Sequence, residues 1–173
     1  MSMFTAIDLP EPKAIKFLFA NTQIAWVWLL LRLYLGYEWG MAGWAKLTDA
    51  DGVWIGAKAG TAITGFLNGA LQKTTGTHPD VSGWYAWFIQ NVALAHPVIF
   101  SYMIVFGELA VGAGLVVGLF TVLAAFFGVV MNLNFLFAGT VSVNPIMLLM
   151  GILLIFAWRI CGYWGLDYFR TKR

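Results

Sequence analysis

Residues 32–46 read RLYLGYEWGMAGWAK, so that Arg32, Glu38 and Lys46 stand among aliphatic, aromatic and glycine residues. The stretch overlaps an apolar run that is long enough to cross a bilayer, because a membrane-spanning helix needs about 17 to 25 predominantly apolar residues. A charged side chain within such a run is costly unless it faces the protein interior and finds a partner. These residues therefore predict a membrane helix whose charged side chains face the protein interior and have a structural or functional role.

The rest of the chain continues this pattern. Its residues are 61% hydrophobic and 10% charged, with a mean hydropathy of +0.80, whereas soluble domains carry about 25% charged residues. Four apolar runs of spanning length lie at about 22–44, 98–117, 121–139 and 144–160. We expect an all-α integral membrane protein of the cell membrane, with residues 1–173 forming one domain built as a four-transmembrane-helix bundle in the lipid bilayer.

Basic residues gather near the two ends of the chain, at Lys13, Lys16, Arg159, Arg170, Lys172 and Arg173. Because cytoplasmic segments of membrane proteins carry an excess of Lys and Arg, both termini are predicted to be cytoplasmic. A net charge of only +2, with no basic cluster interleaved with aromatic residues, gives no indication of a nucleic-acid partner.

The connection at about 47–97 is then predicted to lie outside, in the periplasm or extracellular space. It is rich in glycine and aromatic residues, and it includes two stretches compatible with short helices. We expect a long, partly helical outer loop. The tryptophans near this side include Trp39, Trp44, Trp84 and Trp87. They fit either an ordinary interfacial aromatic belt or the wall of a quinone pocket, and composition leaves both interpretations open.

Polar residues recur at one depth of the predicted bundle. At about 1.5 Å rise per residue, Arg32, Glu108 and Asn132 each lie roughly ten residues, or about 15 Å, inside their apolar runs. We expect Arg32 to pair with Glu108, either as a functional group or as a structural ion pair. Asn132, and Asn134 on the same run, are expected to satisfy the remaining donors or to bind a ligand.

Few other residues suggest chemistry. Glu38 and Lys46 are expected nearer the outer surface, either at a functional site or extending toward water. His96 lies where the loop enters the second run, and Cys161 is expected to be a packed, inert thiol. The two histidines and the single cysteine give no metal-binding motif, and no flavin, haem or iron–sulfur motif is visible.

Three stretches together resemble the DoxX/DoxD family of four-helix membrane proteins: RLYLGYEWGMAGWAK at 32–46, GELAVGAGLVVGLFT at 107–121 and MNLNFLFAGTVSVNP at 131–145. The resemblance extends over most of residues 25–165, and the long loop favours the DoxD side. The positions that carry the resemblance are Arg32, Glu38, Gly43, Lys46, Gly107, Glu108, Asn132, Asn144 and Pro145.

DoxD is described as a subunit of thiosulfate:quinone oxidoreductase, so the resemblance implies oxidation of thiosulfate to tetrathionate, a quinone as electron acceptor and a DoxA-like partner subunit. On this hypothesis Arg32 anchors the anion and Lys46 lies at the rim of its entrance. Glu108 or Glu38 exchanges a proton with the quinone. Further substrate contacts are assigned to Asn132, Asn134, Asn144 and His96.

Two other functional classes stay open at this point. The chain could be a non-catalytic membrane anchor or scaffold for a soluble redox partner, or, less in keeping with its small size, an anion transporter. Its small residues, such as Gly107, Gly114 and Gly118, could also support a homodimer.

Overall fold

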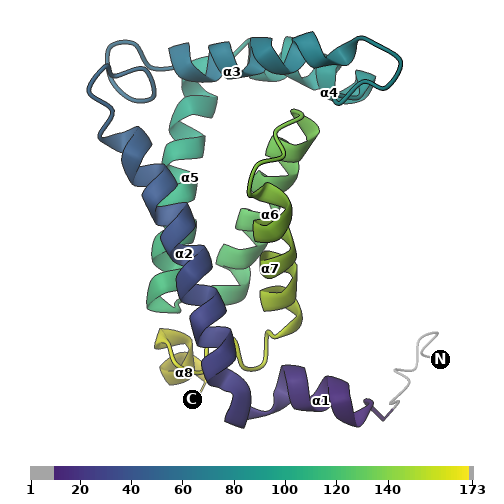
Figure 1. Cartoon of the computed structure of the whole chain (residues 1–173). Helices are drawn as coiled ribbons and strands as arrows, with labels where there is room; N and C mark the ends of the chain where they lie inside the picture. The colour runs from purple at the N-terminus through teal and green to yellow at the C-terminus, as the bar shows by residue number, and fades with distance from the viewer. Residues whose placement is uncertain (1–9, 172–173) are drawn as a thin grey trace, which may run out of the picture.

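The four apolar runs form helices that lie alongside one another (Figure 1). The structure is a computed structural model that describes residues 10–171, and these residues form helices, turns and loops without a strand. Lys172 and Arg173, used above to predict orientation, lie outside the described residues. The bundle helices are α2 (Ala25–Leu47), α5 (Pro97–Val117), α6 (Thr121–Phe137) and α7 (Asn144–Phe156).

Glycines set the distance between α2 and α5. Gly36 lies against Leu115 and Val116, Gly40 against Gly112, and Gly43 against Glu108 and Leu109. A Cβ atom placed on Gly112 would lie 2.5 Å from the backbone nitrogen of Gly40, so the two backbones are in direct contact. The order of these contacts shows that α2 and α5 are antiparallel. Small residues facing each other allow this approach.

Local sequence signals mark where α5 ends and where α7 begins. Gly118 ends α5 with a φ of +70°, a conformation that glycine adopts without strain. Pro145 lies in the first turn of α7, where its missing N–H costs nothing. The helices start within one residue of the predicted positions in three of the four runs. The exception is the first, where the chain bends by 52° between Lys13–Ala20 and Thr22–Leu47.

Short helices cover the two ends of the bundle (Figure 1). At one end, the α3/α4 end, lie α3 (Thr61–Leu71), η2 (Gln72–Thr74), α4 (Gly83–Phe88) and the π-helical η3 (Ile89–Ala93). At the other, the α8 end, lie α1 (Lys13–Ala20), η1 (Thr22–Ile24) and α8 (Leu166–Thr171). The predicted partly helical loop is confirmed, and it has an apolar core of its own around Ile63, Leu67, Val81, Tyr85 and Ile89.

By length and composition, α5 is the one described helix that could cross a membrane unaided, and the bent pair α1 and α2 passes the same test together. Helices α6 and α7 are apolar but shorter, with 17 and 13 residues. The runs predicted to end at residues 139 and 160 therefore end earlier as regular helix, at Phe137 and Phe156.

Candidate functional site

A buried ion pair joins α2 to α5. The Lys46 Nζ donates to both carboxylate oxygens of Glu108, at 2.9 Å to Oε1 and 2.7 Å to Oε2. Glu108 is only 1% exposed and Lys46 20%. The Lys46 ammonium also lies 5.2 Å from the centre of the Trp54 ring, within range of a cation–π interaction. The prediction that Glu108 pairs with Arg32 is therefore wrong, and Lys46 is its partner.

The register of the two helices explains this outcome. Gly43 contacts Glu108, so the carboxylate lies near the last turn of α2, whereas Arg32 lies near the level of Gly118 after the end of α5. Because α2 begins at Ala25 rather than at residue 22, Arg32 is nearer the helix start than its position in the apolar run suggested. The 14 residues between Arg32 and Lys46 span about 21 Å of helix. One small anion therefore cannot contact both cations.

Arg32 is buried at the α8 end, where α2 meets the turn between α5 and α6. Its Nη2 donates to the carbonyl of Trp164 at 3.0 Å, while Nε and Nη1 have no hydrogen-bond partner among the described residues. A Cβ atom on Gly118 or Gly165 would collide with Nη1, so both glycines make room for the guanidinium. Asp167 lies close enough to act on Arg32 electrostatically.

Asp167 also joins α8 to the start of α6. Its carboxylate accepts hydrogen bonds from the backbone N–H groups of Phe120 at 2.9 Å and Thr121 at 2.8 Å. The N-cap residue Phe120 offers no side-chain cap of its own, so Asp167 caps the start of α6 from α8. Cys161 lies in the same region, and burial, together with Asp167, raises the pKa of its thiol to about 12. The thiol stays protonated at neutral pH, in keeping with the predicted inert role.

Asn132 lies inside the bundle with no hydrogen-bond partner for its amide among the described residues. The preceding residue, Met131, contacts Gly107, which places Asn132 near the level of Glu108. One helical turn away, Gly128 faces the indole Nε1 of Trp39, which is also buried without a partner. The predicted depth of Glu108 and Asn132 is thus shared, while Arg32 is absent from that level.

The other predicted site residues do not converge. Glu38 lies beside Tyr34 on its own helix, and Asn144 donates to the carbonyl of Thr140, one turn earlier. His96 is exposed at the start of α5. The remaining tryptophans of the predicted quinone site, Trp44, Trp84 and Trp87, are each more than half exposed, whereas Trp39 is buried. None of these four tryptophans lines the cavity between α5 and α6 described next.

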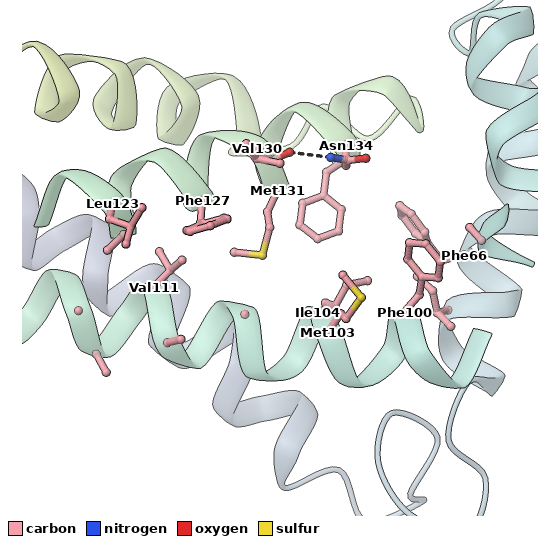
Figure 2. Close-up of a pocket in the computed structure, with 18 of the residues that line it drawn as sticks. Phe66, Phe100, Met103, Ile104, Val111, Leu123, Phe127, Val130, Met131 and Asn134 are labelled. Carbon is pink, nitrogen blue, oxygen red and sulfur yellow. Dashed lines mark hydrogen bonds between the residues drawn. The ribbon is translucent and has the colours of Figure 1, made fainter. Parts of the chain in front are cut away.

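An apolar cavity of about 830 Å³ lies between α5 and α6 and extends to the α3/α4 end of the bundle (Figure 2). Phe66 and Phe100 lie at its α3/α4 end, and Leu123 lies toward the other end (Figure 2). Among its lining residues, Tyr85 and Asn134 are the two with oxygen or nitrogen in their side chains. Asn134 is the one residue of the predicted substrate set that lines it.

Small side chains on α5 leave room for this cavity. Gly107, Ala110 and Gly114 face it from α5, opposite Leu123, Phe127 and Met131 of α6. In the sequence, Gly107 and Gly114 indicate only small residues that could support a homodimer. Small residues on α5 indicate a groove only when large residues face them, and the sequence does not show that Leu123, Phe127 and Met131 of α6 do so.

Tyr85 and Asn134 form a polar pair at the α3/α4 end of the cavity. The Tyr85 hydroxyl donates toward the backbone carbonyl of Asn134 at 2.9 Å and lies 3.1 Å from its side-chain oxygen. Asn134 Nδ2 donates to the carbonyl of Val130 at 2.8 Å. Burial raises the pKa of the Tyr85 phenol to about 12, so that it stays a donor at neutral pH.

Within residues 10–171, no three His, Cys, Asp or Glu side chains gather where they could hold a metal ion. The arrangement instead offers a lipophilic cavity with one polar end and, on an adjacent face of α5, a buried carboxylate paired with a lysine. Such a cavity is suited to an apolar molecule that carries a few polar atoms.

The family model described as DoxX matches residues 27–141, which include α2, the segments at the α3/α4 end, α5 and α6. No curated protein and no solved structure matches the chain significantly.

Proposed function

This chain belongs to the DoxX family of membrane proteins, and we propose that it is a subunit of a quinone-linked membrane oxidoreductase. The observation that carries the proposal is the cavity of about 830 Å³ between α5 and α6, which is apolar along its length and polar at one end. Quinones are small ring molecules that dissolve in the bilayer, and such a cavity suits them in polarity and size.

We propose a four-span topology, with α2, α5, α6 and α7 crossing the bilayer. Helices α1 and α8 lie at the same end of the bundle, as an even number of passes requires (Figure 1). The basic residues near this end favour a cytoplasmic location for it. The α3/α4 end would then face the periplasm or the extracellular space. Flanking turns and local thinning of the bilayer can accommodate the short helices α6 and α7.

The reaction we propose reduces the quinone with electrons from thiosulfate. Two thiosulfate dianions lose two electrons and join through a new sulfur–sulfur bond as tetrathionate. The quinone takes up these two electrons and two protons to become the quinol. The thiosulfate assignment is supported by the resemblance of residues 32–46 and of the long loop to DoxD.

We propose that the protons reach the quinone through Glu108. Gly107 lines the cavity and directly precedes Glu108, so the carboxylate and the cavity lie on adjacent faces of one turn of α5. Lys46, its partner, is partly exposed and lies toward the α3/α4 end. Because Lys46 and Arg32 are engaged at separate places in the bundle, the sulfur anion is better placed at a surface shared with a DoxA-like subunit.

The test is quinone binding and reduction by the purified chain in lipid nanodiscs, with thiosulfate as donor. The Ala110→Trp variant fills the middle of the cavity, and Leu149→Trp places the same ring on an exposed site of α7 outside it. We expect Ala110→Trp to lose quinone binding at least tenfold and Leu149→Trp to bind as the unmodified protein does.

Binding lost in neither variant would contradict the cavity as the quinone site. Quinone binding without turnover, restored by no added DoxA-like partner, would instead support a scaffold that docks a soluble redox enzyme.

A further inference from the structure

The cavity between α5 and α6 is elongated. Its α5 lining extends from Phe100 to Val117, which are 17 residues apart and therefore span about 26 Å of helix. This length approaches the roughly 30 Å of a bilayer's hydrocarbon core. A quinone ring by itself would occupy only one end of the cavity, and the remaining length would have to be occupied by another apolar group.

We propose that the cavity binds a quinone with a long prenyl chain, the ring lying at the α3/α4 end beside Asn134 and the chain extended toward the turn between α5 and α6. This inference rests on the proposed function, because it assumes that the occupant is a quinone. It adds the class of quinone, the orientation of the molecule and the residues that contact each end.

The ring is assigned to the α3/α4 end because the polar atoms of the lining are there. Asn134 uses one amide N–H on the Val130 carbonyl, and no described residue accepts the second, which is left for a quinone carbonyl. The Tyr85 hydroxyl lies within hydrogen-bond distance of both the backbone carbonyl and the side-chain oxygen of Asn134, at 2.9 and 3.1 Å, so it adds a second polar group at this end. Figure 2 shows Asn134 on α6 in the half of the cavity that also holds Phe66 and Phe100.

The chain is assigned to the opposite half because no polar side chain lines it. Leu119, Leu123 and Phe127 face the cavity there, opposite Gly114 and Val117 of α5. Ala110 and Leu123 are exposed in the isolated protein, so the cavity is open on its membrane side along part of its length. A hydrocarbon chain could enter sideways from the bilayer, and water would gain no hydrogen bond by filling this half.

The first experiment maps the two ends of the ligand by photo-crosslinking in nanodiscs. One long-chain quinone probe carries a diazirine next to the ring, and a second carries it at the end of the prenyl chain. We expect the ring probe to label the region of Asn134 and Tyr85, and the tail probe to label 117–123. The reverse pattern, or equal labelling of both regions by both probes, would overturn the proposal.

Phospholipids supply the competing source of an apolar chain. A phospholipid with a diazirine at the end of one acyl chain is therefore tested in the same nanodiscs, with unlabelled long-chain quinone as competitor. We expect the quinone to displace any labelling of 117–123 by this lipid. Lipid labelling that the quinone does not displace would identify the occupant as a phospholipid chain and overturn the proposal.

The second experiment compares quinones with long and short chains. Leu123→Trp blocks the tail half of the cavity, and Leu149→Trp is the matched control on α7. We expect Leu123→Trp to weaken binding of the long-chain quinone at least tenfold and to leave the short-chain analogue within twofold. An equal loss for both quinones would overturn the proposed orientation. These are binding measurements, so they stay informative if thiosulfate turnover fails.

Discussion

Helix α5 has two faces that both carry small residues, but one face is tightly packed and the other lines a cavity. On the face toward α2, Gly112 meets Gly40 so closely that the backbones touch, and the Lys46–Glu108 ion pair lies beside this contact. On the face toward α6, Gly107 and Ala110 line an open cavity opposite Phe127 and Met131. Small residues bring two helices together when the facing helix is also small, and they leave a groove when large side chains hold the facing helix away.

The difference predicts opposite tolerance to added volume on the two faces. A larger residue on the α2 face meets backbone, which cannot move without displacing a helix. On the α6 face, a larger residue at Gly107 meets the end of the flexible Met131 side chain, and one at the exposed Ala110 extends into the cavity. Three of the four predictions below test this contrast and the second tests the ion pair on the α2 face, from the largest expected effect to the smallest.

The largest effect is expected for Gly112→Leu. Its Cβ atom would lie 2.5 Å from the nitrogen and 2.6 Å from the Cα of Gly40, so α2 and α5 would have to separate. We expect no folded protein, measured as the loss of a single symmetric peak in gel filtration of the detergent-solubilised chain. A variant that elutes and melts like the unmodified protein would show that the close contact is not required.

The next effect concerns the ion pair. Removing one partner of a buried pair leaves an uncompensated charge and typically costs about 3–5 kcal/mol. We expect Lys46→Met to lower the free energy of unfolding by this amount, measured by denaturant titration in mixed micelles. The double variant Lys46→Met with Glu108→Met should recover most of the loss, because it removes both charges. Additive losses in the double variant would argue against direct pairing.

A smaller effect is expected for Gly107→Ala, on the cavity face. Its Cβ atom would meet the Sδ of Met131 at 3.2 Å, and this flexible side chain can move aside. We expect a loss of less than about 1 kcal/mol, since small surface and rim changes are usually mild. The melting temperature measures it. Gly43→Ala is the control, because its Cβ atom would lie 2.9 Å from the backbone nitrogen of Leu109 and should cost clearly more.

The smallest change in stability is expected for Ala110→Leu. The residue is exposed and faces the cavity, so the longer side chain should change the free energy of unfolding by less than about 0.5 kcal/mol. Quinone affinity should still fall, because the side chain takes cavity space. A large destabilisation here would show that the two faces of α5 do not differ as described.

The sequence predicted the helices well and their pairing poorly. The runs expected from residues 98, 121 and 144 form α5, α6 and α7, because hydropathy, Gly118 and Pro145 are local signals that tertiary contacts reinforce. The partner of Glu108 was not local. It depends on how far α2 is shifted along α5. The chain bends before Ala25, so counting residues from the start of the apolar run gave the wrong depth for Arg32.

The candidate site shows the same division. Asn134 was predicted as a ligand contact, and it lines the cavity. The tryptophans predicted to hold a quinone do not line it, because an aromatic belt and a pocket wall have the same composition. Phe66, Phe127 and Leu123 carried no signal of their own, since apolar residues on a membrane helix face lipid, protein or a cavity alike.

By itself the sequence determined that this protein is helical, apolar enough for a membrane and related in its motifs to the DoxX family. These properties follow from composition, local periodicity and short motifs, which need no knowledge of neighbours in space. Only the tertiary structure decided that Lys46 neutralises Glu108, that Arg32 lies at the opposite end and that α5 encloses a cavity with α6. Each of these three features depends on which helices are neighbours and on how far one helix is shifted along the other.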